Sequence, residues 1–143
     1  ASEKFRKTLI LLVEDLKGDL WTLLQFVPSP CDAGCQSDLY RSRQVWLALD
    51  RRRTRVQRIA IVADADEAQA LAVIAAEADP NLKLRIVEDD DPLRGFLRDP
   101  AHGPGAFYVI DPIGNWVLWY DRSTELRDIH TDFKKLLRLS KIG

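Results

Sequence analysis

The chain has 143 residues, of which 46% are hydrophobic and 30% are charged, and its formal net charge is −1. This length and composition indicate one soluble domain over residues 1–143, large enough to bury a core of its own. The near-neutral charge argues against nucleic acid or an anionic membrane surface as a partner. No apolar run approaches the length of a membrane span.

Apolar runs predict three strands and three helices in the first two thirds of the chain. Residues 20–27 are nearly continuous in apolar and β-prone residues, which is typical of a strand covered on both faces, and Pro28 and Pro30 end the run. Helical spacing follows over residues 35–50. The remaining elements predicted here are a strand over 55–64, an alanine-rich helix over 66–78, a strand over 82–88 and a short helix over 91–98.

The last third predicts a hairpin and a closing helix. Residues 105–111 and 116–120 have strand composition, and the turn between them contains Gly114 and Asn115, residues that tolerate unusual φ angles. Residues 124–142 form an amphipathic helical pattern. The order β–α–β–α–β–α–β–β–α predicts an α/β fold with a central mixed sheet flanked by helices. It resembles the thioredoxin arrangement, with a strand and a helix added in the middle.

Two cysteines, Cys31 and Cys35, are the only ones in the chain, and both follow the first predicted core strand. A disulfide between them would close a very small loop, so it would add little stability, and chemistry is the better reason for pairing. At the start of a helix, the partial positive charge of the helix N-terminus favours the thiolate form. Thiolates in this place suit disulfide exchange and are also soft ligands for Cu(I) or zinc. A structural disulfide and two buried thiols remain alternatives.

The motif C-x-x-x-C and the later stretch "FYVIDPIGNWVLWY" resemble the Sco/SenC family of copper-handling thioredoxin-fold proteins, over most of the chain from Trp21 onward. "PCDAGC", "DPIGN" and "LLRLSKIG" resemble, more closely, small membrane-anchored thioredoxin-like proteins of proteobacteria that are encoded beside oxidase-assembly genes. The resemblance implies an assembly factor for cytochrome c oxidase that acts by thiol–disulfide exchange or by Cu(I) delivery. It implies oxidase subunits or other copper and thiol assembly proteins as partners, and a position on the periplasmic side of the inner membrane.

Departures from the Sco pattern affect the expected site. Sco proteins have prolines where this chain has Asp32 and Gln36, and a copper-binding histidine where it has Gly103. His102 stands one position earlier and is therefore a candidate third copper ligand beside the cysteines, and the other interpretation is a solvent-exposed histidine in the loop. Pro104 resembles in its place the cis-proline that faces the cysteines in thioredoxin-fold oxidoreductases, with a trans-proline in a turn as the alternative.

The expected roles are attack by the Cys31 thiolate and resolution by Cys35. One alternative is a non-catalytic scaffold of the same fold with a vestigial or locked cysteine pair, and another is a general dithiol oxidoreductase. The chain lacks methionine and begins with alanine, so we expect that a signal or membrane anchor has been removed, or that a tag has left a scar.

Four further features are predicted to have structural roles. The arginine-rich segment 50–55 is expected to be a solvated loop after a helix end rather than a phosphate site. The acidic segment 88–92 is expected to cap a helix rather than bind a hard metal. His130 is expected at the surface or boundary of the terminal helix. The aromatic strand 116–120 is expected to pack in the core, with one exposed side as the alternative.

Overall fold

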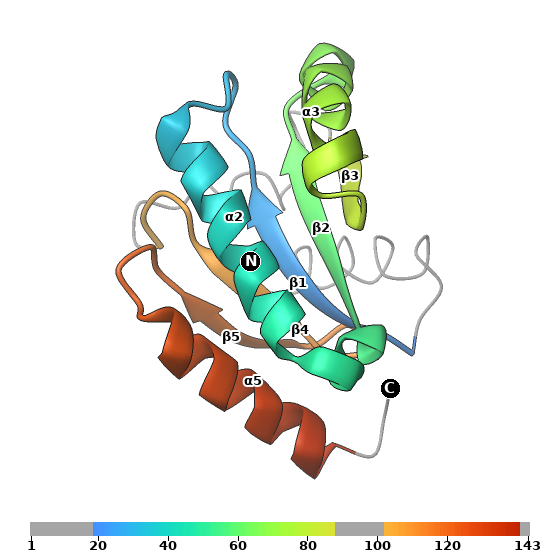
Figure 1. Cartoon of the computed structure of the whole chain (residues 1–143), viewed down its shortest axis with the longest axis vertical. Helices are drawn as coiled ribbons and strands as arrows, with labels where there is room; N and C mark the ends of the chain where they lie inside the picture. Colours follow the sequence, from blue (N-terminus) through green and yellow to red (C-terminus); the bar gives the residue numbers. More distant parts are fainter. Residues whose placement is uncertain (1–18, 88–101, 141–143) are drawn as a thin grey trace.

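A computed structural model describes residues 19–87 and 102–140 of the chain (Figure 1). The predicted helix over 91–98 and the acidic segment 88–92 lie outside the described residues. The strands are β1 (Trp21–Phe26), β2 (Val56–Val62), β3 (Leu82–Ile86), β4 (Phe107–Ile110) and β5 (Trp116–Tyr120). The helices are α2 (Ala33–Ala48), the 3₁₀ helix η1 (Asp50–Arg55), α3 (Ala65–Ala78) and α5 (Leu126–Leu139).

The five strands form one mixed sheet in the order β3-β2-β1-β4-β5. β1, β2 and β3 are parallel neighbours, β4 runs antiparallel to β1, and β5 runs antiparallel to β4. The parallel core and the C-terminal hairpin are therefore confirmed. β1 is central and nearly all of its residues are buried, as its nearly continuous apolar pattern predicts.

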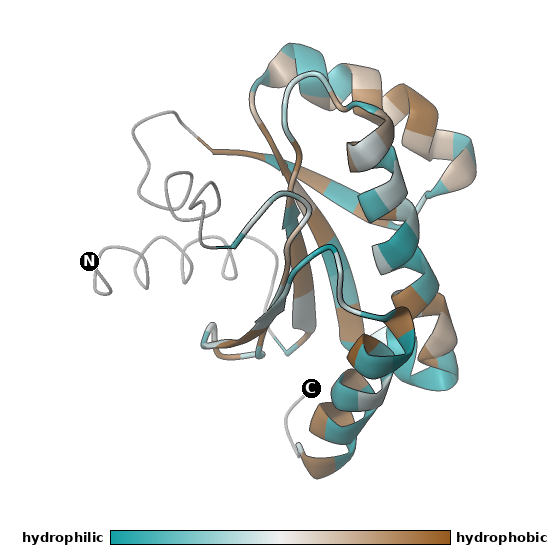
Figure 2. Ribbon diagram, turned by 90° about the vertical axis from the view of Figure 1, so that its left-hand side faces the viewer, coloured by the Kyte–Doolittle hydropathy of each residue, from teal (hydrophilic) through white to brown (hydrophobic). Residues whose placement is uncertain are grey.

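The helices α2, α3 and α5 cover the same face of the sheet (Figure 2). Side chains from α2 and α5 pack with β1, β4 and β5 in one core cluster, and side chains from α2 and α3 pack with β2 in another. A third cluster, on the other face, contains Leu24, Ile59, Tyr108 and Ile110 and no residue of these helices. The two faces of the sheet thus have separate environments, which matters for the placement of the candidate site residues.

The hairpin turn forms as its sequence predicts. The carboxylate of Asp111 accepts hydrogen bonds from the backbone N–H groups of Ile113, at 3.1 Å, and Asn115, at 2.8 Å. Gly114 has a φ of 91°, which a residue with a side chain rarely adopts. The Asp-Pro-x-Gly sequence therefore sets the register of β4 and β5 locally.

The prediction for residues 50–55 was wrong in form, because they make the 3₁₀ helix η1 rather than a loop. Its last residue, Arg55, donates a hydrogen bond of 2.9 Å to the carbonyl of Leu137 near the end of α5. His130 is partly buried, and its Nε2 lies 2.8 Å from the carbonyl oxygen of Ala48, so it lies at the boundary between α5 and α2 as expected. Segment and histidine both join α5 to the rest of the fold.

A buried arginine links β2 to both neighbouring helices. The guanidinium of Arg58 is almost fully buried, forms an ion pair with Asp79 after α3, and donates to Ser42 and to the carbonyl of Leu39 on α2. Burial lowers the pKa of Arg58 from its ordinary value, and the Asp79 carboxylate opposes that effect.

Asp79→Ala is expected to lower the free energy of unfolding by about 3 kcal/mol, because Arg58 would stay buried without its counter-charge. Asp64→Ala, which removes only the side-chain cap at the other end of α3, is the control and is expected to cost about 1 kcal/mol. Urea unfolding measures both. Equal losses would contradict a special role for the buried pair.

Within residues 19–87 and 102–140, no helix is long and apolar enough to cross a membrane.

Candidate dithiol site

Cys31 and Cys35 form a disulfide at the junction between β1 and α2, with their Cα atoms 5.2 Å apart. Cys35 lies in the first turn of α2, and Cys31 precedes the helix. The junction is at the carboxyl end of two parallel strands, where α/β proteins commonly place their sites. The sequence placed both cysteines correctly, and the structure shows them bonded.

The two sulfurs differ in exposure. Cys35 is only 4% exposed and packs with Leu39, Leu71 and the end of β2, whereas Cys31 is partly exposed and contacts the same cluster from its rim. An incoming sulfur in solution therefore reaches Cys31 more easily than Cys35. This asymmetry fits the predicted roles of attacking and resolving cysteine.

The first turn of α2 presents its positive end to the pair. Asp32 is the N-cap, and its carboxylate accepts a 2.8 Å hydrogen bond from the backbone N–H of Cys35. The amides of Ala33 and Gly34 begin the helix and have no carbonyl one turn earlier within it. These amides and the helix dipole favour negative charge on Cys31 after reduction.

Glu67 on α3 holds the segment that carries Cys31. Its carboxylate accepts hydrogen bonds from the backbone N–H of Cys31, at 3.2 Å, and from the hydroxyl of Ser29, at 3.3 Å. Glu67 is the third residue of α3, and its amide donates to the N-cap Asp64. In a capping box such a glutamate side chain would return to the N-cap amide, but here it reaches across to the cysteine segment instead.

Glu67→Ala is expected to lower the free energy of unfolding by about 1–2 kcal/mol, because two donors on the cysteine segment lose a charged acceptor that is only partly screened by solvent. Asp66→Ala, an exposed neighbour in the same helical turn, is the control and should cost about 0.5 kcal/mol through the helix dipole. Thermal or urea unfolding of the oxidised protein measures the difference. A smaller loss for Glu67→Ala than for the control would contradict the role of Glu67 as a tether.

The side chain of Arg122 packs against the turn that contains the two cysteines. Arg122, after β5, donates to both carboxylate oxygens of the buried Asp38 on α2, at 2.9 and 2.7 Å. This bond raises the pKa of Arg122 above its ordinary value, and the nearby charge of Asp32 adds to the effect. Arg122 also lies so close to Gly34 that a Cβ there would be 3.2 Å from Nη2. The guanidinium thus packs against the turn between the two cysteines.

The loop before β4 lies at the end of the sheet near this site, because Phe107 at the start of β4 pairs with Gln25 near the end of β1. Gly105 has a φ of 74° and lies against Asp38, so that a Cβ on Gly105 would be 2.6 Å from Oδ1. Pro104 is exposed. Among the described residues the one cis peptide bond is Ser29–Pro30, so the Gly103–Pro104 bond is trans. The cis interpretation of Pro104 was therefore wrong and the trans alternative is the one observed, while Gly105 lies against Asp38 of α2.

His102 begins the same loop, but its ring lies on the face of the sheet opposite α2. Its Nδ1 is 3.1 Å from the hydroxyl of Tyr108, and its ring centroid is 4.8 Å from that of Trp119. Tyr108 belongs to the core cluster without helix residues, whereas its neighbour Phe107 faces α2 and α5. Trp119 is 39% exposed, so one side of β5 is partly exposed, which was the alternative for that strand.

The structure thus does not bring His102 to the two cysteines. No group of three or more histidine, cysteine, aspartate or glutamate side chains arranged to hold a metal ion occurs in the part of the chain that the structure describes. The structure therefore brings together two of the three predicted metal ligands, Cys31 and Cys35, and places His102 against aromatic side chains instead.

Residues 21–140 match the protein family described as "Transmembrane-like, thioredoxin-like, C-terminal domain". The chain belongs to this family. A comparison with curated proteins gives no match.

Solved structures with a similar fold include Sco proteins. Copper-bound ScoI of Arabidopsis thaliana superposes with a TM-score of 0.71 at 18% identity, covering 90% of this chain and 89% of that chain. Copper-bound Sco1 of yeast gives a TM-score of 0.68 at 17% identity, covering 94% and 84%. BsSco, described as having a disulfide switch and as a member of the Sco family of cytochrome c oxidase assembly proteins, gives 0.62 at 20% identity, covering 89% and 85%. These likenesses confirm the predicted thioredoxin-like fold.

Proposed function

We propose that this domain exchanges disulfides with a partner protein, with Cys31 as the attacking and Cys35 as the resolving cysteine. One observation carries the proposal: a partly exposed sulfur is bonded to a buried one at the N-terminus of α2. A purely structural bond has little reason to be here, because it closes a very small loop and the fold already has an extensive core.

The exchange proceeds in two balanced steps. In the reduced domain, the Cys31 thiolate attacks one sulfur of the partner's disulfide, a Cys31–partner bond forms, and the partner's other sulfur leaves as a thiolate. Cys35 then loses its proton and attacks Cys31, which restores the Cys31–Cys35 bond and releases the partner's second thiolate. The two electrons come from the dithiol, and a dithiol protein of the same compartment must supply two more for the next cycle.

The proposed setting is the assembly of a respiratory cytochrome c oxidase on the periplasmic side of the inner membrane, with the domain attached to the membrane by a segment outside this chain. The resemblance of the sequence to Sco-like proteins and the similarity of the fold support this setting, and disulfides persist in such an oxidising compartment. The proposed partners are oxidase subunits or other thiol and copper assembly proteins.

Trapping tests this function. Cys35→Ser, expressed in the native host, should accumulate mixed disulfides through Cys31, and mass spectrometry should identify an oxidase subunit or an assembly protein in them. The double variant Cys31→Ser/Cys35→Ser is the control. Normal oxidase assembly in cells that carry only the double variant would instead support the alternative of a non-catalytic scaffold.

Copper delivery is a second candidate, supported by the two adjacent sulfurs and by the copper-bound Sco structures of the same fold. The cargo would be Cu(I) held by the Cys31 and Cys35 thiolates after reduction, because soft ligands favour this ion. A titration of the reduced domain against a chromogenic Cu(I) chelator tests it. Cys31→Ser should abolish competitive binding, and His102→Ala should leave it unchanged, since the ring faces away from the pair. A weakened affinity in His102→Ala would contradict the two-sulfur site.

A further inference from the structure

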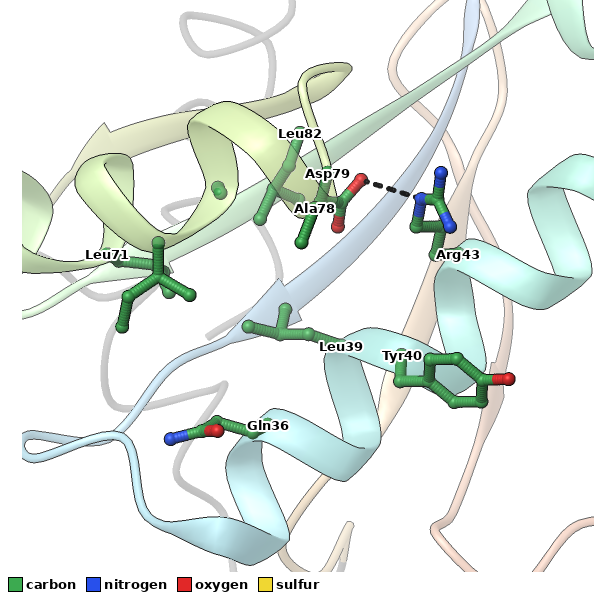
Figure 3. A pocket seen from close by; sticks show the side chains of 10 residues that line it. Gln36, Leu39, Tyr40, Arg43, Leu71, Ala78, Asp79 and Leu82 are labelled. Carbon is green, nitrogen blue, oxygen red and sulfur yellow. Dashed lines mark ion pairs between the residues drawn. The ribbon is translucent and has the colours of Figure 1, made fainter.

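A groove of about 310 Å³ lies between α2 and α3 (Figure 3). We call it the α2–α3 groove, and most of its walls are apolar. Its lining includes Leu39, Tyr40 and Arg43 of α2 and Leu71 and Ile74 of α3. Figure 3 shows Gln36 toward one end and the ion pair of Arg43 and Asp79 toward the other.

The groove is continuous with the dithiol site. Gln36 directly follows Cys35, and its side-chain amide lies 3.4 Å from the carbonyl oxygen of Cys31, to which it donates. Leu39 and Leu71 line the groove and also pack against Cys35 in the same core cluster. A chain bonded to Cys31 is therefore at the entrance of the groove.

The rim of the groove exposes large apolar side chains. Tyr40 on α2 is 61% exposed, and Ile74 on α3 is 58% exposed. Val73, the neighbour of Ile74, is 73% exposed but does not line the groove. Tyr40 and Ile74 therefore expose apolar surface on the two sides of the α2–α3 groove. Val73, exposed on the same helix as Ile74 but outside the groove, is a matched control position.

The far end of the groove has an excess of positive charge. Asp79 faces two guanidinium groups, the buried Arg58 and the one-third exposed Arg43, whose Nε lies 3.6 Å from the carboxylate. One positive charge is therefore left over, and Arg43 is the group that solvent reaches. A carboxylate from a bound chain would complement this charge.

We propose that the α2–α3 groove binds the segment of the exchange partner that carries its cysteine, with apolar side chains in the groove and an acidic residue on Arg43. Cys35 and Arg43 are eight residues apart on one helix, or about 12 Å. The partner is bonded to Cys31, whose Cα lies 5.2 Å from that of Cys35, so its chain has about 12–17 Å to cover, which takes about four or five residues of an extended chain. The partner is thus expected to have an acidic residue about four or five positions from its cysteine, with apolar residues between. This inference rests on the proposed function.

Binding is tested with unreactive peptides. The probes are two fluorescein-labelled nonapeptides in which serine replaces the cysteine. Glutamate stands four positions after the serine in one and four positions before it in the other, and in both peptides leucine and valine lie between the serine and the glutamate. Fluorescence anisotropy against the oxidised domain should give saturable binding for one of them. Ile74→Ser and Tyr40→Ser should each weaken it by about fivefold or more, while Val73→Ser should leave it unchanged.

A double-mutant cycle tests the contact between Arg43 and the acidic residue of the peptide. Replacing the peptide glutamate by glutamine should weaken binding to the unaltered domain by about three- to tenfold at low salt. The same replacement should not change the affinity of the peptide for the Arg43→Gln variant. Absence of binding for both peptides, or equal losses for Ile74→Ser and Val73→Ser, would overturn the inference.

Exchange is measured separately, as reduction of the glutathione mixed disulfide of the cysteine peptide by the reduced domain. A domain that exchanges but does not bind the unreactive peptide retains the proposed function and loses this inference. A domain that binds the peptide but does not exchange loses the proposed function, and with it the assignment of the occupant as a disulfide partner. Binding with exchange that slows in Ile74→Ser but not in Val73→Ser supports both.

Discussion

Cys31→Ser is expected to slow reduction of a peptide–glutathione disulfide by at least about 100-fold, because the remaining thiol of Cys35 is buried. Cys35→Ser is expected to retain the first step and to stop there, since no second thiol is in place to release the bound peptide. Stopped-flow mixing followed by acid quench and mass spectrometry measures both the rate and the trapped product.

The two variants control for each other, because each removes one sulfur from the same turn. The opposite result, with exchange retained in Cys31→Ser and lost in Cys35→Ser, would contradict the assigned roles. The difference in burial predicts that neither variant completes the exchange, and that Cys35→Ser accumulates a product linked through Cys31.

Gly105→Ala is expected to lower the free energy of unfolding by about 2–4 kcal/mol. The positive φ accounts for about 1 kcal/mol of this, and the rest arises because the new Cβ would overlap the Asp38 carboxylate, which the Arg122 ion pair and burial hold in place. Urea unfolding of the oxidised domain measures the loss.

Gly103→Ala is the matched control. Gly103 has almost the same φ, 73° against 74°, but a Cβ there would meet nothing within 4 Å. The control should therefore show only the strain of about 1 kcal/mol. Equal losses in the two variants would mean that the contact between this loop and α2 contributes nothing.

Local patterns were sufficient to predict the strands, most helices and the hairpin. The apolar run of β1 by itself indicates a strand that is buried on both faces. The Asp-Pro-x-Gly turn is set by hydrogen bonds between residues that are neighbours in the sequence. The position of the cysteines followed from the same logic. η1 was missed because its formation depends on contacts with α5 that lie far away in the sequence.

The rest of the site depends on contacts between distant segments. His102 was a candidate ligand beside the cysteines because of the resemblance, but its contacts with Tyr108 and Trp119 place its ring on the other face. No local pattern indicates the contact of Glu67 with Cys31, which spans 36 positions. The bond from Arg122 to Asp38 spans 84 positions. Asp32, directly before the helix that follows β1, is a typical N-cap residue and therefore a local signal for the start of α2.

The reduction potential of the Cys31–Cys35 pair tests the central claim most directly. It can be determined from the fraction of disulfide at equilibrium in buffers of reduced and oxidised dithiothreitol or glutathione, with the free thiols counted by alkylation and mass spectrometry. A pair that cycles is expected between about −200 and −280 mV, the range in which dithiol proteins donate and accept electrons. A value below about −300 mV, typical of structural disulfides, would contradict a working dithiol and leave a scaffold with a locked bond.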